Sequence, residues 1–201
     1  ERLKLAPGTN LDFATTVPQG QEVLFAEYRY KHSLALERVK AKVEAVEEEF
    51  YRHFGRRYGG LVETYRAEDA EVVLVTAGSC AGTAKVVVDR AREAGQRVGL
   101  VRIRVFRPFP RERLRELLNG KRGVGVIDRS VCLGWHCGHL FMELKAIWHE
   151  IEARPAALVD FIDGVGNLDI TVEHVQQALD LTRQAIEGEK VPEVNWLMLA
   201  D

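Results

Sequence analysis

Two thiols and two imidazoles stand close together between residues 132 and 139. Cys132, His136, Cys137 and His139 are side chains of the types that bind zinc. Their C-x4-C spacing, with a histidine two residues later, is not that of a standard zinc finger, and no second ligand pair follows downstream. We therefore interpret the segment as a glycine-rich loop that enters a helix, with thiols packed as small apolar groups. A zinc site is the alternative.

The same thiols could act as nucleophiles or cluster ligands, but each role lacks a partner. A nucleophilic thiol needs a base that points at it, and residues this close on a turn seldom face one another. A four-iron cluster needs four thiolates, whereas the chain has three cysteines. A serine hydrolase is not indicated, because Gly-x-Ser-x-Gly is absent. No residue of the chain is therefore assigned as catalytic or metal-binding.

Two further glycine-containing segments follow apolar strands. The first, GSCAGT at residues 78–83, contains neither G-x-G-x-x-G nor the P-loop pattern. We interpret it as a tight turn before a helix capped by Ser79 or Thr83, with a phosphate or anion contact as the alternative. The second runs from Asp163 to Thr171 and predicts a connector in which Thr171 caps the last helix. A contact surface for a partner chain is the alternative there.

The stretch from Val98 to Pro110, VGLVRIRVFRPFP, begins as a buried strand and ends in a stiff turn. Its β-branched and apolar first half is typical of an inner strand. Pro108 and Pro110 lack a backbone donor and restrict the preceding residue, so Arg107 and Phe109 are held at the strand's carboxyl end. Open α/β sheets bind ligands at that end. A guanidinium flanked by aromatic rings suits a subunit contact, a brace within the domain, or direct contact with a substrate.

These candidates need a sheet that brings strand ends together, and the pattern of the chain predicts one. The expected strands are Val72 to Ala77, Val98 to Val105, Val124 to Asp128 and Leu158 to Ile162, with a short edge strand at Leu61 to Tyr65. The expected helices are Thr83 to Ala94, Arg111 to Leu118, Gly138 to Glu152 and Val172 to Ile186. Strands that alternate with helices predict right-handed crossovers and a doubly wound, mostly parallel α/β sheet covered on both faces.

A long helix is expected ahead of the sheet. Apolar residues recur every three or four positions from Leu34 to Phe54, which predicts an amphipathic helix ending at Gly55. Residues 1 to about 33 contain prolines and glycines without a clear period, and we expect an arm that lies on another surface. We therefore divide the chain into an arm with a long helix, residues 1–55, and an α/β domain, residues 56–201.

Composition excludes several classes of function. The 201 residues carry 28 Lys and Arg against 30 Asp and Glu, a net charge of −2, so no global basic field exists to hold nucleic acid or an anionic membrane. No apolar run reaches the roughly 18 residues of a membrane span, and no signal peptide is visible. An odd number of cysteines in a chain of this size fits a reducing compartment. We expect a cytoplasmic protein.

Several short sequence motifs occur together and in order between about residues 50 and 175. They are Phe54-Gly55-Arg56, Asp69-Ala70-Glu71-Val72, Gly78-Ser79, Gly82-Thr83-Ala84-Lys85, Phe106-Arg107-Pro108-Phe109-Pro110, Asp128-Arg129 and Asp169-Ile170-Thr171. In this respect the chain resembles the α subunit of pyruvate:ferredoxin oxidoreductase, or pyruvate synthase. The resemblance implies the second domain of that subunit, which is similar to the C-terminal domain of transketolases.

The resemblance also implies a function for the assembled enzyme. Such complexes oxidatively decarboxylate a 2-oxoacid on thiamine pyrophosphate with Mg, pass electrons through 4Fe–4S clusters to ferredoxin, and yield an acyl-CoA, or run in reverse. The diphosphate-binding Gly-Asp-Gly motif and the cluster cysteines are missing here, so the cofactors would be bound mainly by other domains or by subunits of the β, γ and δ types. We expect the chain alone to be inactive, to bind no cofactor by itself, and to contact those subunits.

The residues expected at an interface or cleft are Phe106, Arg107, Pro108, Phe109, Arg129 and Asp169. Two alternative functions stay open. One is a free-standing nucleotide- or metal-binding α/β module, and the other is the equivalent subunit of an enzyme for oxalate or a branched 2-oxoacid. The loop at residues 164–171 reads GVGNLDIT where the family usually has GLGGRDIT, which leaves the choice of 2-oxoacid undecided.

Overall fold

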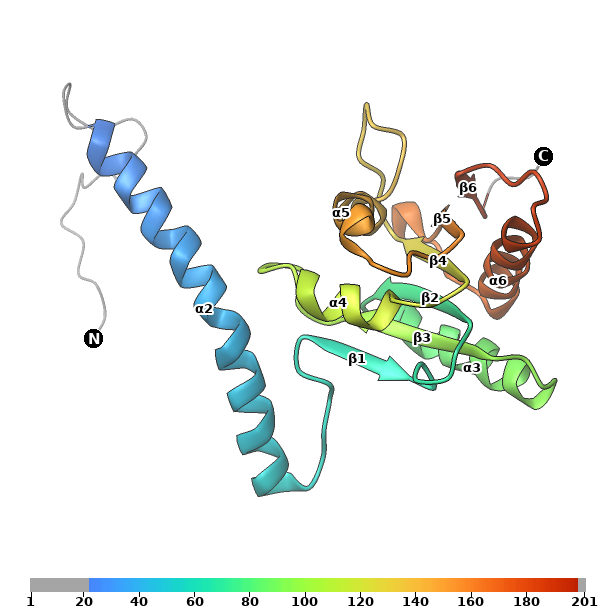
Figure 1. Cartoon of the computed structure of the whole chain (residues 1–201), viewed down its shortest axis with the longest axis horizontal. Helices are drawn as coiled ribbons and strands as arrows, with labels where there is room; N and C mark the ends of the chain where they lie inside the picture. The colour runs from blue at the N-terminus through green and yellow to red at the C-terminus, as the bar shows by residue number, and fades with distance from the viewer. Residues whose placement is uncertain (1–21, 199–201) are drawn as a thin grey trace.

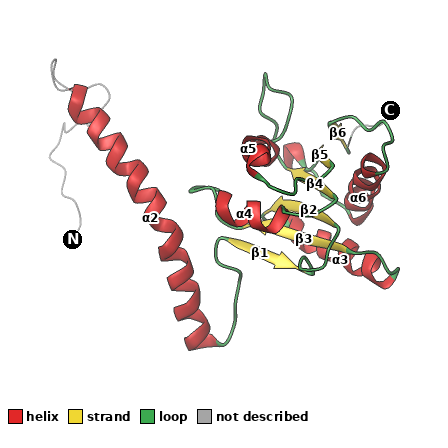
Figure 2. Ribbon diagram, in the orientation of Figure 1, coloured by secondary structure: helices red, strands yellow, loops and turns green. Residues whose placement is uncertain are grey.

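Residues 22–198 are described by the structure, a computed structural model in which one long helix precedes an α/β sheet (Figure 1). In chain order the elements are α2 (Glu22–Phe54), β1 (Val62–Tyr65), β2 (Val72–Ala77), α3 (Cys80–Glu93), β3 (Val98–Ile103), α4 (Arg111–Leu118), β4 (Gly123–Asp128), α5 (His139–Ile147), η1 (Trp148–Glu150), β5 (Ala157–Ile162), η2 (Val165–Asn167), α6 (Val172–Ile186) and β6 (Val194–Trp196). Figure 2 shows the strands gathered between helices, with α2 standing apart for most of its length.

The strands form one sheet in the order β1-β3-β2-β4-β5-β6, and every neighbouring pair but one is parallel. The exception is β1, which runs antiparallel to β3 with Val62 opposite Ile103 and Tyr65 opposite Leu100. After β2 the chain forms β3 on one side of that strand and then β4 on the other, which places a topological switch point between β2 and β4. The prediction of a mostly parallel sheet is confirmed.

Apolar cores lie on both faces of the sheet. One core contains Leu114 of α4 and Phe141 of α5, and the other contains Val87 of α3 and Leu179 of α6. Successive residues of β2 enter the two cores in turn, because side chains alternate between the faces of a strand. The inner strands therefore read as continuous apolar runs, and the doubly wound arrangement is confirmed.

The predicted elements hold, with shifts at some ends. β2, α4 and α6 have the expected bounds. By contrast, α3 begins at Cys80 instead of Thr83, β3 ends at Ile103 instead of Val105, and α5 stops at Ile147 before a short 3-10 turn. Nothing in the sequence pattern predicts β6, because its three residues are too few to show an alternation.

The long helix α2 corrects one expectation. It starts at Glu22, well before Leu34, so the prediction of an arm extending to about residue 33 is wrong. Tyr30 in this first part is 64% exposed, and a helix with no buried face shows no apolar period. Glu27 and Lys31 support the helix instead with an i,i+4 ion pair of 2.6 Å. The remainder of the predicted arm, residues 1–21, lies outside the described residues.

The second half of α2 is joined to the sheet domain by charged contacts. Lys40 pairs with Glu112 of α4 at 3.1 Å, and the Glu44 carboxylate accepts the Leu61 N–H at 3.1 Å. The division of the chain at residues 55 and 56 stays a prediction. From residue 22 to residue 198, no helix combines the length and apolar character needed to cross a membrane.

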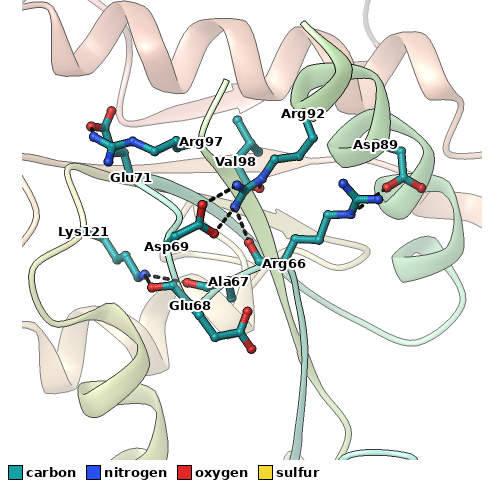
Figure 3. Close-up of polar contacts among 10 residues, drawn as sticks. All are labelled: Arg66, Ala67, Glu68, Asp69, Glu71, Asp89, Arg92, Arg97, Val98 and Lys121. Carbon is teal, nitrogen blue, oxygen red and sulfur yellow. Dashed lines mark hydrogen bonds and ion pairs between the residues drawn. The ribbon is translucent and has the colours of Figure 1, made fainter. Parts of the chain in front are cut away.

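At the amino ends of the parallel strands, Arg92 fixes the connection between β1 and β2 (Figure 3). Its guanidinium donates to both carboxylate oxygens of Asp69, at 2.7 and 2.8 Å, and to the Arg66 carbonyl at 2.6 Å. This contact lowers the pKa of Asp69 to about 2. Gly99 of β3 lies close to this connection, because a Cβ at Gly99 would be only 2.6 Å from the Arg66 carbonyl oxygen. The ion pair and the close approach together hold the turn that makes β1 antiparallel.

Candidate functional site

The candidate residues lie where the parallel strands end. We call this region the carboxyl edge, defined by the loops after β2, β3, β4 and β5 at residues 78–79, 104–110, 129–138 and 163–171. Because those strands are parallel, their carboxyl ends meet at one edge of the sheet, the edge where open α/β sheets bind ligands. All six interface or cleft candidates are there: Phe106, Arg107, Pro108, Phe109, Arg129 and Asp169.

The proline-containing turn after β3 is braced from within the domain. Pro108 and Pro110 are buried, and Phe109 packs partly buried against the core beneath α4 and α5. The peptide bond between Arg107 and Pro108 is cis. The rings of Phe106 and Phe109 meet edge to face with centroids 6.1 Å apart. The buried side chains of Pro108 and Pro110, together with Phe109, therefore hold the shape of the turn.

Arg107 itself points outward from this turn. Its guanidinium pairs with Glu143 of α5, donates to the Phe106 carbonyl at 2.9 Å, and lies 4.1 Å from the centroid of the Phe106 ring. The side chain is nevertheless 53% exposed, as Phe106 is in part. The brace considered from the sequence is thus present, and a cationic and aromatic surface remains on the outside. Whether a subunit covers that surface stays a prediction.

The turn at the switch point is built differently from the expectation. Ser79 precedes α3 in a helical conformation and makes no side-chain capping bond, and Thr83 lies inside the helix, so the predicted cap is wrong. Cys80 is buried instead, with its sulfur 2.5 Å from the Thr76 hydroxyl. Burial raises the pKa of the Cys80 thiol, while the Thr76 hydroxyl and the charge of Arg129 act against that rise. The turn is closed by a thiol held in a neutral form.

Arg129 and Asp169 occupy the next two loops. Arg129 follows β4, is exposed, and lies with its guanidinium 3.5 Å from the Gly164 carbonyl in the loop after β5. Asp169 is exposed in that second loop. The predicted cap by Thr171 is confirmed, since its hydroxyl accepts the His174 N–H at 3.2 Å. The structure therefore brings Arg129 to the loop that carries Asp169.

A buried carboxylate beside this loop was not anticipated. Asp163 is fully buried and accepts the Gly164 N–H at 2.8 Å, and its other oxygen lies 3.0 Å from Nδ1 of His174. Burying a charge without a partner is costly, so an aspartate at the end of an apolar strand is itself a sign that a partner exists. The position of Asp163 in the sequence thus indicates that a partner exists, but it does not identify that partner as His174.

Two further buried carboxyls, Asp128 and Asp160, lie under the cysteine-containing loop. Asp128 accepts the N–H groups of Leu140 and Phe141 at 3.0 Å each, at the first turn of α5. Asp160 accepts the Gly138 N–H at 2.6 Å through one oxygen, and its other oxygen has no hydrogen-bond partner among residues 22–198. Burial, with the nearby Asp128, raises the pKa of Asp160 to about 7, and burial also raises that of Asp128. Asp160 is thus near its midpoint at neutral pH.

The loop above these carboxyls is a narrow hairpin. The Cys132 N–H donates to the Cys137 carbonyl at 2.8 Å, and the two residues form an isolated antiparallel bridge. Leu133 and Trp135 at the tip are 89% and 67% exposed. Among the described residues, no three His, Cys, Asp or Glu side chains are arranged to hold a metal ion. The zinc alternative therefore receives no support from the arrangement of these side chains.

Comparisons with known proteins agree with this geometry. The family model for pyruvate:ferredoxin oxidoreductase core domain II matches residues 70–175, which include all six candidate residues. Pyruvate synthase subunit PorA of Thermotoga maritima is 42% identical over 164 residues, covering 82% of this chain and 40% of the relative. The α subunit of NADH-dependent phenylglyoxylate dehydrogenase of Aromatoleum evansii is 37% identical over 174 residues, covering 86% of this chain and 42% of the relative.

A solved 2-oxoglutarate:ferredoxin oxidoreductase from Magnetococcus marinus is a more distant match. It shares 17% identity with a TM-score of 0.44, over 69% of this chain and 21% of that chain. The chain spans less than half the length of the two curated relatives above. The family model, by contrast, covers just over half of the 201 residues. The chain belongs to the pyruvate:ferredoxin oxidoreductase family, and it contains the region known there as core domain II.

Proposed function

We propose that this chain is part of the α subunit of a 2-oxoacid:ferredoxin oxidoreductase that acts on pyruvate. The complete enzyme would convert pyruvate, CoA and oxidised ferredoxin to acetyl-CoA, CO2 and reduced ferredoxin, or catalyse the reverse. The observation that carries the proposal is the 42% identity to a pyruvate synthase subunit over most of this chain. A free-standing nucleotide- or metal-binding module is not favoured, since the relatives are named as oxidoreductase subunits.

Within that enzyme, we assign the chain a structural and subunit-contacting role. The carboxyl edge offers Arg107 beside Phe106 on the loop after β3, and Arg129 on the loop after β4, all at least partly exposed. Arginine and aromatic residues are enriched at protein interfaces, whereas lysine and glutamate are depleted. The partners would be the β, γ and δ subunit types, with ferredoxin reached through the complex. The three free thiols are in keeping with the predicted cytoplasmic location.

The side chains of this chain do not fit the cofactors of the reaction. A 4Fe–4S cluster requires four thiolates, and the chain has three cysteines, one of which is enclosed between β2 and α3. The diphosphate-binding Gly-Asp-Gly motif is also absent from the sequence. We therefore assign thiamine pyrophosphate, Mg and the iron–sulfur clusters to other segments of the complex, and no catalytic step to this chain.

One observation favours a second candidate substrate. The phenylglyoxylate dehydrogenase subunit is 37% identical over 174 residues, and the name of that enzyme specifies NADH in place of ferredoxin. An aromatic 2-oxoacid and a different electron carrier are therefore the alternative for this chain.

The test is to isolate the native complex through an affinity tag on this chain. CoA-dependent reduction of ferredoxin, and separately of NAD, would be measured with pyruvate, 2-oxoisovalerate and phenylglyoxylate. We expect the highest kcat/KM with pyruvate and ferredoxin, and no activity in the isolated chain. A complex without thiamine, or one whose activity requires no 2-oxoacid, would contradict the proposal.

The contact role has its own test. Arg107→Glu should reduce the recovery of partner subunits at least tenfold, because it reverses a charge at the centre of the proposed contact. Arg113→Glu is the matched control, since Arg113 is an exposed arginine of α4 that pairs with Glu116 in its own helix. Equal recovery with both variants would remove the carboxyl edge from the interface.

A further inference from the structure

The cysteine hairpin at residues 132–137 has a feature that the proposed function does not use. Cys132 and Cys137 lie directly opposite one another in an antiparallel bridge, joined by the 2.8 Å hydrogen bond from the Cys132 N–H to the Cys137 carbonyl. Opposed residues of a hydrogen-bonded antiparallel pair have Cα atoms about 5.5 Å apart. A disulfide requires a Cα separation of about 4.4–6.8 Å, most often 5.5–6 Å. The Cα separation typical of such a pair lies within the range that a disulfide requires.

The two side chains also lie near one another. Both are free thiols, and the Cys132 thiol is among the groups whose charge raises the pKa of Cys137. The hairpin between them is closed by Gly134 and His136 in left-handed conformations, with the Trp135 N–H donating to the Cys132 carbonyl at 3.0 Å. These turns fix the register of the pair, so bond formation needs no change of register.

We propose that Cys132 and Cys137 form a reversible intramolecular disulfide that closes this hairpin and fixes its exposed tip. The tip consists of Leu133 and Trp135, at 89% and 67% exposure. The proposal stands apart from the proposed oxidoreductase function, because it concerns only the thiols of this chain. It also separates these two cysteines from Cys80, which is buried between β2 and α3 with the Thr76 hydroxyl and the Ala77 carbonyl as partners.

The oxidant that we name is a low-molecular-weight disulfide of the glutathione class. Cys132 is partly exposed and reacts first, while Cys137 is only 4% exposed. The Cys132 thiolate attacks one sulfur of the disulfide, forms a mixed disulfide and releases one thiol. The Cys137 thiolate then attacks the Cys132 sulfur and releases the second thiol. Two protein thiols are oxidised to one disulfide, and one small disulfide is reduced to two thiols, so electrons and protons balance.

The surroundings of Cys137 set the pace of the closing step. Burial, followed by the charge of Asp160, raises the pKa of Cys137 to about 11. Its thiolate is therefore a small fraction at neutral pH, and that fraction grows about tenfold for each pH unit. The rate at which the mixed disulfide converts to the closed hairpin should therefore rise about tenfold for each pH unit between pH 7 and pH 9.

The test uses the purified 201-residue chain in buffers of graded reduced and oxidised glutathione. After an acid quench, the protein is denatured, free thiols are alkylated, and trypsin is added. Arg129 and Lys145 bound a single tryptic peptide, Ser130 to Lys145, that contains both hairpin cysteines, whereas Cys80 is in another peptide. We expect the first peptide to lose both alkyl groups and two hydrogens together, and the Cys80 peptide to stay alkylated throughout.

Two single substitutions make the order of events visible. Cys137→Ser should stop at a glutathione adduct on Cys132, and Cys132→Ser should leave Cys137 alkylated. The proposal is overturned if the wild-type peptide keeps two alkyl groups or gains two glutathiones, if Cys80 is joined to either hairpin cysteine, or if the bond forms only between two chains. Each of these products has a distinct mass.

Discussion

Replacing Asp160 by Asn should change how the stability of the protein depends on pH. Asp160 is fully buried, one of its oxygens has no hydrogen-bond partner in the described part of the chain, and its folded-state pKa is raised from 3.8 to about 7. A carboxyl with a raised folded pKa binds its proton more tightly in the folded protein than in the unfolded chain. Its contribution to stability is therefore present at low pH, and is lost as pH rises from about 4 through about 7.

The size of the effect follows from the two pKa values. A shift from 3.8 to about 7 corresponds to about 4 kcal/mol in full, and about 3 kcal/mol of this is lost between pH 5 and pH 8. An asparagine side chain does not ionise, and it can still accept the Gly138 N–H through its carbonyl oxygen. The free energy of unfolding of Asp160→Asn, relative to wild type, should thus rise by about 3 kcal/mol from pH 5 to pH 8.

Urea unfolding at pH 5, 6, 7 and 8 measures this difference. Asp169→Asn is the matched control, because Asp169 is an exposed aspartate at the same edge of the sheet. Some pH dependence should remain in Asp160→Asn, since burial also raises the pKa of Asp128. If the curves of Asp160→Asn and wild type run parallel from pH 5 to pH 8, the buried carboxyl does not carry the proton that we assign to it.

Two further substitutions test packing and capping, each against a control. Gly99→Ala should lower the free energy of unfolding by about 1–3 kcal/mol in a denaturant titration, because its Cβ would lie 2.6 Å from the Arg66 carbonyl oxygen. Gly82→Ala is the control: a Cβ there would have nothing within 4 Å, so the same titration should show stability unchanged or raised. Thr171→Ala should cost about 1 kcal/mol through loss of the cap, whereas Ser79→Ala should cost almost nothing in thermal unfolding because Ser79 makes no capping bond. Equal losses within either pair would refute the corresponding reasoning.

The sequence was most informative where burial leaves a pattern. β2 and α6 were predicted to the residue, since β2 is apolar throughout and α6 combines a helical period with the Thr171 cap. The first part of α2 and the whole of β6 were not predicted, because an exposed or very short element does not need a periodic pattern of apolar residues. Exposure of a helix therefore hides it from this kind of inference, even when its residues favour helix formation.

The candidate site was predictable only as far as local chemistry extends. The prolines placed Arg107 on a stiff turn, but its partner Glu143 comes from a helix 36 residues later in the chain. Asp160 looks like an ordinary interruption of an apolar strand, and its raised pKa arises from burial and from the charge of Asp128 on β4. The pairing of Cys132 with Cys137 likewise depends on a hairpin register that the sequence spacing alone does not reveal.

The two outermost strands of the sheet limit how this protein can meet other chains. β1 offers four residues and β6 three, so a newcomer aligned with either margin would gain few main-chain hydrogen bonds. On the β1 side, Glu63 is also engaged by Arg102 at 3.1 Å and by Lys85. Growth of the sheet from one molecule into the next is therefore disfavoured. Association must depend on the shape and charge of side chains, which allows a crowded cell to contain this domain without strand-by-strand aggregation.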